Sequence, residues 1–287
     1  MRFALSVVAA VILASALPAQ NTLPAPGAQN AIRAIRTVVS DSEDGPAVSG
    51  EGFRSGEQVF FSFQVENYKT GPTGKVQLTG HIQAFDPKGV PVSPPDEVVI
   101  GTTMSEEDKA WKPKLRSQIQ LPSIAPAGTY AIKYDVTDLQ TKQTASGEVT
   151  FRLGGRSVAT ADTLTIRGLG LYRTQDEETP LRIAAYRPGD ILWVRFDVVG
   201  FKHGEQNSVD VAYDVAVVTG DGKPLFAQEL AAVEKSQAFY PQPWVPGEFN
   251  LTLQSNMSTG PYTLIITAHD GMDSDKTVVA KAQFKVE

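Results

Sequence analysis

Residues 53–71, FRSGEQVFFSFQVENYKTG, are matched 133 residues later by YRPGDILWVRFDVVGFKHG at residues 186–204. Both segments carry an arginine, a glycine and an acidic residue ahead of a run with apolar side chains at alternate positions. Such alternation is typical of a β-strand with one face buried in a sheet. Because similarity at a fixed offset marks a repeated structural unit, the two segments predict two copies of one domain.

The repeat extends through most of each half of the chain. Trp111 and Pro113 of the first copy correspond to Trp244 and Pro246 of the second. Each copy contains about seven or eight short alternating segments separated by turn signals such as DPKG and GDGK, and no convincing amphipathic helix. The sequence therefore predicts an all-β protein with tandem Greek-key β-sandwich domains at residues 33–155 and 156–287.

A family resemblance supports this fold. The segments Gly128-Thr129-Tyr130-x-Ile132 and Gly260-Pro261-Tyr262-x-Leu264 resemble the Gly-x-Tyr-x-Cys strand of immunoglobulin-like domains, with an aliphatic residue in place of cysteine. Both copies are in this respect similar to the fibronectin-type and immunoglobulin-like modules of bacterial exported proteins, and also to macroglobulin-type modules. Both lack the disulfide cysteines and the third-strand tryptophan of antibody domains. The resemblance implies an immunoglobulin-like sandwich and implies no particular function.

The first nineteen residues, MRFALSVVAAVILASALPA, combine one early positive charge, a short apolar run and small residues. This pattern is typical of a secretory signal peptide, with cleavage expected near Ala16 or Ala19. Residues 20–32 are rich in proline and alanine and predict a flexible tether. We expect an extracytoplasmic protein, periplasmic or secreted, with no transmembrane segment in the mature chain. The alanine-rich signal and the lack of cysteine favour a bacterial source.

Composition argues against several classes of function. The chain has 26 Lys and Arg against 32 Asp and Glu, with no basic cluster, so nucleic-acid binding is not expected. It has no cysteine, which excludes thiol catalysis and thiolate metal sites. No Gly-x-Ser-x-Gly elbow or phosphate-binding loop occurs, and His81, His203 and His269 fit exposed positions. We expect no catalytic residues and no enzyme activity.

Acidic residues gather in three turns. Calcium takes six to eight oxygen ligands, and carboxylates grouped at the end of a sandwich are suitable donors. The alternative is that these turns are simply solvated. No cofactor other than calcium is suggested. The candidate calcium ligands are Asp41, Glu43, Asp44, Asp176, Glu177, Glu178, Asp270, Asp273 and Asp275.

Aromatic residues of the second copy are candidates for contact with a partner, because exposed aromatic side chains anchor proteins or stack on sugar rings. Phe239 and Tyr240 align with glutamates in the first copy, so the shared fold does not require them. Trp244 recurs as Trp111, so the alternative is that it fills the end of a sandwich. The candidate binding residues are Phe239, Tyr240, Trp244 and Trp193.

The sequence as a whole predicts a non-enzymatic, exported binding or structural module. Its expected partner is a protein of the cell envelope or the extracellular space. Two alternatives stay open: a carbohydrate-binding module that uses the aromatic residues of the second copy on a polysaccharide, and an accessory subunit of an envelope enzyme.

Overall fold

A computed structural model describes residues 30–287 apart from residues 51, 109 and 275. The predicted signal peptide and most of the predicted tether lie outside the described residues. Ile32–Glu287 form one compact unit whose regular secondary structure is almost all β-strand, with the short 3-10 turns η2 (Glu106–Asp108) and η3 (Glu205–Asn207). The all-β prediction is confirmed. Within the described residues, no helix has the length and apolarity needed to cross a membrane.

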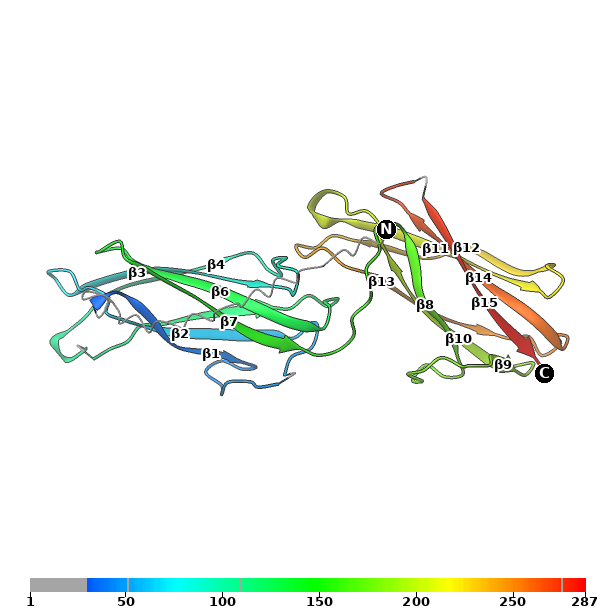
Figure 1. Ribbon diagram of the computed structural model, residues 1–287, viewed down its shortest axis with the longest axis horizontal. Coiled ribbons are helices and arrows are strands. Elements are labelled where there is room, and N and C mark those ends of the chain that lie inside the picture. Colours follow the sequence, from blue (N-terminus) through cyan, green and yellow to red (C-terminus); the bar gives the residue numbers. More distant parts are fainter. Residues whose placement is uncertain (1–29, 51, 109, 275) are drawn as a thin grey trace, which may run out of the picture. The chain divides into compact units, whose positions relative to one another are not determined.

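The first sandwich contains a three-stranded sheet, ordered β1-β2-β5, and a four-stranded sheet, ordered β4-β3-β6-β7 (Figure 1). Its named strands pair antiparallel, and Phe53 adds an isolated parallel bridge to Leu153. The chain passes from one sheet to the other after β2, β4 and β5, which is the Greek-key crossing that the resemblance implied. The strands are β1 (Arg33–Ser40), β2 (Gln58–Glu66), β3 (Lys75–Phe85), β4 (Asp96–Thr103), β5 (Lys114–Gln120), β6 (Gly128–Asp138) and β7 (Thr144–Leu153).

The second sandwich repeats this arrangement with the sheets β13-β10-β8 and β12-β11-β14-β15-β9. The short strand β9 pairs parallel with β15, and the other pairs are antiparallel. The strands are β8 (Thr165–Tyr172), β9 (Ala185–Tyr186), β10 (Ile191–Val199), β11 (Val209–Thr219), β12 (Pro224–Ser236), β13 (Val245–Thr252), β14 (Gly260–Asp270) and β15 (Thr277–Val286).

Each pair of sheets encloses its own hydrophobic core. In β2 the buried positions alternate with half-buried ones, and the corresponding strand β10 begins with the same alternation. The alternating apolar residues quoted at the start therefore face inward: Val59, Phe61, Phe63 and Val65 in β2, and Leu192, Val194, Phe196 and Val198 in β10. Burying each of these side chains is worth about 1.5–3 kcal/mol, which supports a fold without disulfides.

The tyrosines of the resemblance motif have the same role in both copies. The Tyr130 hydroxyl donates a hydrogen bond to the Pro126 carbonyl at 2.8 Å, and that of Tyr262 donates to the Ser258 carbonyl at 2.7 Å. In each case the acceptor lies four residues upstream, and the ring packs against a phenylalanine of the last strand. This contact resembles the tyrosine corner of immunoglobulin-like sandwiches.

Candidate functional site

The four candidate aromatic side chains do not form one exposed surface. Tyr240 and Trp244 are each only 5% exposed, Trp193 is half-buried, and Phe239 is 50% exposed. Tyr240 and Trp244 therefore offer little ring surface to a partner, although both line a pocket of about 470 Å³. A binding role for the four residues stays a prediction.

Trp244 lies beneath Arg156, which precedes the first strand of its sandwich. The Arg156 guanidinium is 5.6 Å from the centre of the indole ring. The same guanidinium binds the Asp197 carboxylate through two hydrogen bonds of 2.9 and 2.7 Å. Burial raises the pKa of Asp197, and Arg156 acts in the opposite direction. Trp244 is therefore packed beneath Arg156 at the border of a pocket of about 470 Å³, and its burial agrees with the structural alternative for the repeated tryptophan.

Tyr240 is buried because its hydroxyl has a specific acceptor. It donates a hydrogen bond of 2.9 Å to the Asp86 carboxylate, which also accepts the amide hydrogens of Lys88 and Val90 at 2.8 Å. Burial and the neighbouring Asp86 both raise the pKa of Tyr240. Tyr240, which replaces a glutamate of the first copy, thus makes a structural contact between segments 154 residues apart.

Trp193 lies on the outer face of β10, where a loop covers part of the sheet. Its neighbour Arg195 places its guanidinium 4.2 Å from the centre of the Tyr172 ring. Arg195 also donates hydrogen bonds of 2.6 Å to the carbonyl oxygens of Gln175 and Glu177. The loop that contains the second group of acidic residues is thereby held over this face.

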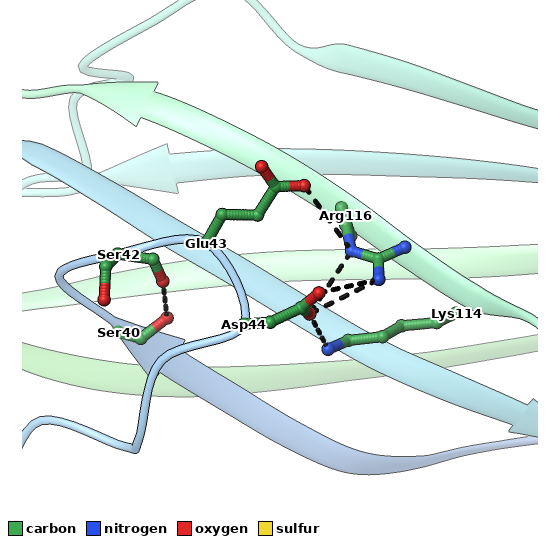
Figure 2. A network of polar contacts seen from close by, with 6 residues as sticks. All are labelled: Ser40, Ser42, Glu43, Asp44, Lys114 and Arg116. Carbon is green, nitrogen blue, oxygen red and sulfur yellow. Dashed lines mark hydrogen bonds and ion pairs between the residues drawn. The ribbon is translucent and has the colours of Figure 1, made fainter.

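The carboxylates of the first acidic turn are paired with basic side chains, as Figure 2 shows. The Asp44 carboxylate pairs with Lys114 and lies 3.0 Å from an Arg116 nitrogen, while Glu43 is 4.0 Å from Arg116. Hydrogen bonds from Arg116, followed by those from Lys114, lower the pKa of Asp44 to about 2. Asp41 instead accepts a hydrogen bond from the Ser42 hydroxyl.

The ion pairs of Asp44 predict an acid-dependent loss of stability. Since the pKa of Asp44 falls from 3.8 to about 2 on folding, its contribution is fully present above about pH 4 and is lost as the pH falls towards 2. Asp44→Asn should therefore narrow the difference in unfolding free energy between pH 5 and pH 2, measured by urea denaturation at low salt. The effect should shrink in high salt because the pair is exposed. An equal narrowing in Asp41→Asn would contradict this assignment.

The second acidic turn is held by its own backbone. The Glu177 carboxylate accepts the Arg173 amide hydrogen at 2.7 Å, whereas Asp176 and Glu178 are exposed. Among the described residues, no contact brings these three carboxylates together at a common centre.

The third acidic turn contains a buried carboxylate with a structural role. Asp270 accepts the amide hydrogens of Lys202 at 2.8 Å and Met272 at 3.0 Å. Asp273 pairs with Lys202 and Lys276, and Asp275 lies outside the described residues. No group of three or more His, Cys, Asp or Glu suited to a metal ion occurs in the part of the chain that the structure describes. Calcium binding stays a prediction that only titration can test.

Asp138 is the counterpart of Asp270 in the first sandwich. It accepts the amide hydrogens of Lys69 at 2.9 Å and Gln140 at 2.8 Å, and the Thr141 hydroxyl at 2.9 Å. Lys69 and Lys202 occupy equivalent places in the repeat. Each sandwich thus uses one buried aspartate in the same way. Asp138 joins the end of β6 to the loop after β2, and Asp270 joins the end of β14 to the loop after β10.

A surface that the sequence did not single out lies on β12. This thirteen-residue strand is the edge of its sheet and is hydrogen-bonded to β11 alone among the described strands. Its side chains are exposed along most of its length. The β12 surface consists of the exposed apolar residues Leu225, Phe226, Leu230 and Val233.

A β-bulge turns Leu230 outward, leaving it 62% exposed. The register between β11 and β12 shifts between Tyr213 and Val215, and Leu230 has a φ of 47°. Its amide hydrogen is accepted by Asp214 at 2.8 Å, and the other Asp214 oxygen lies 2.7 Å from His269. A non-glycine residue in this backbone region costs about 1–3 kcal/mol, and such residues cluster at functional sites. Comparison of the two copies could have indicated this site, because Glu97 of the first copy occupies the position that corresponds to Leu230.

Comparison with known proteins gives no family. No protein-family model matches the sequence, and no curated protein matches it. Matching solved structures include red sea bream transglutaminase, with 9% identity and a TM-score of 0.25 over 88% of this chain. They also include the C-terminal domain of the Streptococcus agalactiae AgI/II polypeptide BspA, with 11% identity and a TM-score of 0.30 over 89% of this chain.

The C-terminal domain of the Streptococcus pyogenes antigen I/II-family protein AspA matches with 9% identity and a TM-score of 0.31 over 88% of this chain. This chain spans 31% of the transglutaminase, 98% of the BspA domain and 99% of the AspA domain. TM-scores below 0.5 do not assign a function to this chain.

Proposed function

We propose that this protein is a non-enzymatic, extracytoplasmic binding module that recognises a protein partner through the β12 surface. The observation that carries the proposal is an edge strand with four exposed apolar side chains. Several exposed apolar side chains on one edge strand favour an interaction site. The signal-peptide pattern at residues 1–19 supports placement outside the cytoplasm.

Strand addition is the mode of recognition that fits this edge. An edge strand presents unpaired amide and carbonyl groups, and an extended segment of a partner can satisfy them. From Ala232 to Ser236 the strand is in regular register with β11, so it offers a straight edge next to the bulge. Pro224, Glu229 and the bulge at Leu230 oppose indiscriminate pairing, which favours a selective partner over self-aggregation.

The test is capture of envelope and culture-supernatant proteins on the immobilised mature chain and on two β12 variants. Leu230→Asn and Val233→Lys should each reduce retention of the partner at least tenfold, since they place polar groups on the apolar surface. Asparagine tolerates the backbone conformation of Leu230, so the bulge should persist. Val99→Lys on β4 is the matched control, because Val99 is an exposed apolar residue on the edge strand of the first sandwich.

Equal retention by the β12 variants and the wild-type chain would contradict the proposal, and so would the absence of any retained protein. An enzyme retained through β12 would make this chain an accessory subunit. Binding of sugar through Tyr240 and Trp244 is not favoured, because both side chains are buried.

A further inference from the structure

A crevice of about 630 Å³ opens at one end of the first sandwich, between the loop after β2 and the loop before β5. We call it the Trp111 crevice. Aromatic, sulfur-containing and polar side chains line it together. Those used below are Glu66, Tyr68, Thr70, Met104, Trp111 and Lys112.

The second sandwich differs from the first in how far its tryptophan is exposed at this end. Trp111 is 39% exposed, whereas its repeat counterpart Trp244 is 5% exposed beneath Arg156. Tyr68 corresponds to Phe201, which is also buried. The equivalent end of the second sandwich carries a different pocket, of about 470 Å³, lined by Phe201 and Trp244 together with Tyr240. Trp111 is the more exposed of the two repeated tryptophans.

The aromatic walls of the crevice are held in place. The Tyr68 hydroxyl contacts the Trp111 carbonyl oxygen at 2.7 Å and the Met104 sulfur at 3.3 Å. The Tyr68 and Trp111 rings lie 6.3 Å apart at 78° to one another. Because the carbonyl belongs to the main chain, this contact does not depend on the indole ring. A ligand would meet a rigid corner formed by two aromatic rings.

The charged side chains that line the crevice are one carboxylate, Glu66, and one amine, Lys112. The Glu66 carboxylate lies 3.0 Å from Lys112 and 2.7 Å from Arg33. Hydrogen bonds from Lys112, followed by those from Arg33, lower the pKa of Glu66, so the carboxylate is charged at neutral pH. A fixed carboxylate accepts hydroxyl donors well. Thr70 adds an exposed hydroxyl at the rim.

We propose that the Trp111 crevice binds a neutral saccharide. The C–H face of a pyranose ring would pack on the exposed indole of Trp111, and its hydroxyls would bond to Glu66 and Thr70. A rigid apolar wall with a few fixed polar groups is the usual composition of a small-ligand site. The lining holds one carboxylate and one amine, and this favours a neutral sugar over an anionic one. Arg33, which also pairs with Glu66, does not line the crevice. This site lies on the other sandwich from β12, so it is a binding activity separate from the proposed protein interaction.

The experiment titrates the mature chain with cellohexaose, maltohexaose and N-acetylchitohexaose, and with polygalacturonate as an anionic probe. Tryptophan fluorescence and isothermal calorimetry report binding. At least one neutral saccharide should bind with millimolar or tighter affinity. Trp111→Ala should weaken that binding at least about tenfold, because stacking on an aromatic ring is lost.

Three further variants keep the test independent of folding. Thr70→Arg leaves Trp111 intact and obstructs the crevice from an exposed position, so it should also weaken binding tenfold. Trp193→Phe removes a different tryptophan and should keep the wild-type affinity, as should the β12 variant Val233→Lys. Binding of polygalacturonate alone, binding that survives Trp111→Ala, or no binding of any neutral saccharide would overturn the proposal.

Discussion

Asp138→Ala is expected to lower the unfolding free energy of the first sandwich by about 3 kcal/mol, because three donors lose a charged acceptor. Asp270→Ala should do the same to the second sandwich, with a smaller loss since Asp270 accepts two amide hydrogens in the contacts described above. Both carboxylates are buried, so water does not readily replace them. Differential scanning calorimetry should show Asp138→Ala melting about 10 °C below the wild-type chain, and Asp270→Ala melting below it by a smaller margin.

Asp273→Ala is the matched control for this prediction. Asp273 lies three residues from Asp270 and pairs with the exposed side chains of Lys202 and Lys276. Exposed pairs of this kind contribute little to stability. If Asp273→Ala destabilised the second sandwich as much as Asp270→Ala, the assigned role of the buried aspartate would be wrong.

The repeat and the alternating pattern predict the fold because both are local properties of the sequence. The residues at alternate positions of β2 and β10 face the core, and Tyr130 and Tyr262 make equivalent contacts. Asp138 and Asp270 also belong to the repeat, but their common role is not visible in the sequence. Each binds one amide two residues further along the chain and one in a loop about seventy residues away, that of Lys69 or Lys202.

Whether a candidate binding residue is exposed depends on contacts that the alternating pattern of the sequence does not encode. Tyr240 is buried because Asp86 lies opposite it, and Trp244 is buried because Arg156 stacks on its ring. Trp111 carries the same Trp-x-Pro motif and stays partly exposed. The β12 surface depends on which strand forms the edge of the sheet, and only the three-dimensional order of strands gives this.

Arg156→Ala is expected to cost the second sandwich about 2–3 kcal/mol at neutral pH, because the buried Asp197 carboxylate loses its cation. Because 56% of the Arg156 side chain is exposed, we expect the loss of unfolding free energy to lie at the lower end of the range for a buried ion pair. Urea denaturation followed by tryptophan fluorescence should detect the loss, and the emission of Trp244 should shift as water reaches its ring.

The pH dependence separates the charge of Arg156 from its packing on Trp244. Burial holds the folded pKa of Asp197 above its unfolded value of 3.8, and removing Arg156 should raise it further. An acid with a raised folded pKa loses stability as the pH rises from the unfolded value through the folded one. Arg156→Ala should therefore recover part of its stability on acidification towards pH 4, and the double variant Arg156→Ala with Asp197→Asn should recover it at pH 7. An equal loss at both pH values, unrelieved by Asp197→Asn, would mean that Arg156 stabilises the sandwich by covering Trp244 and not by neutralising Asp197.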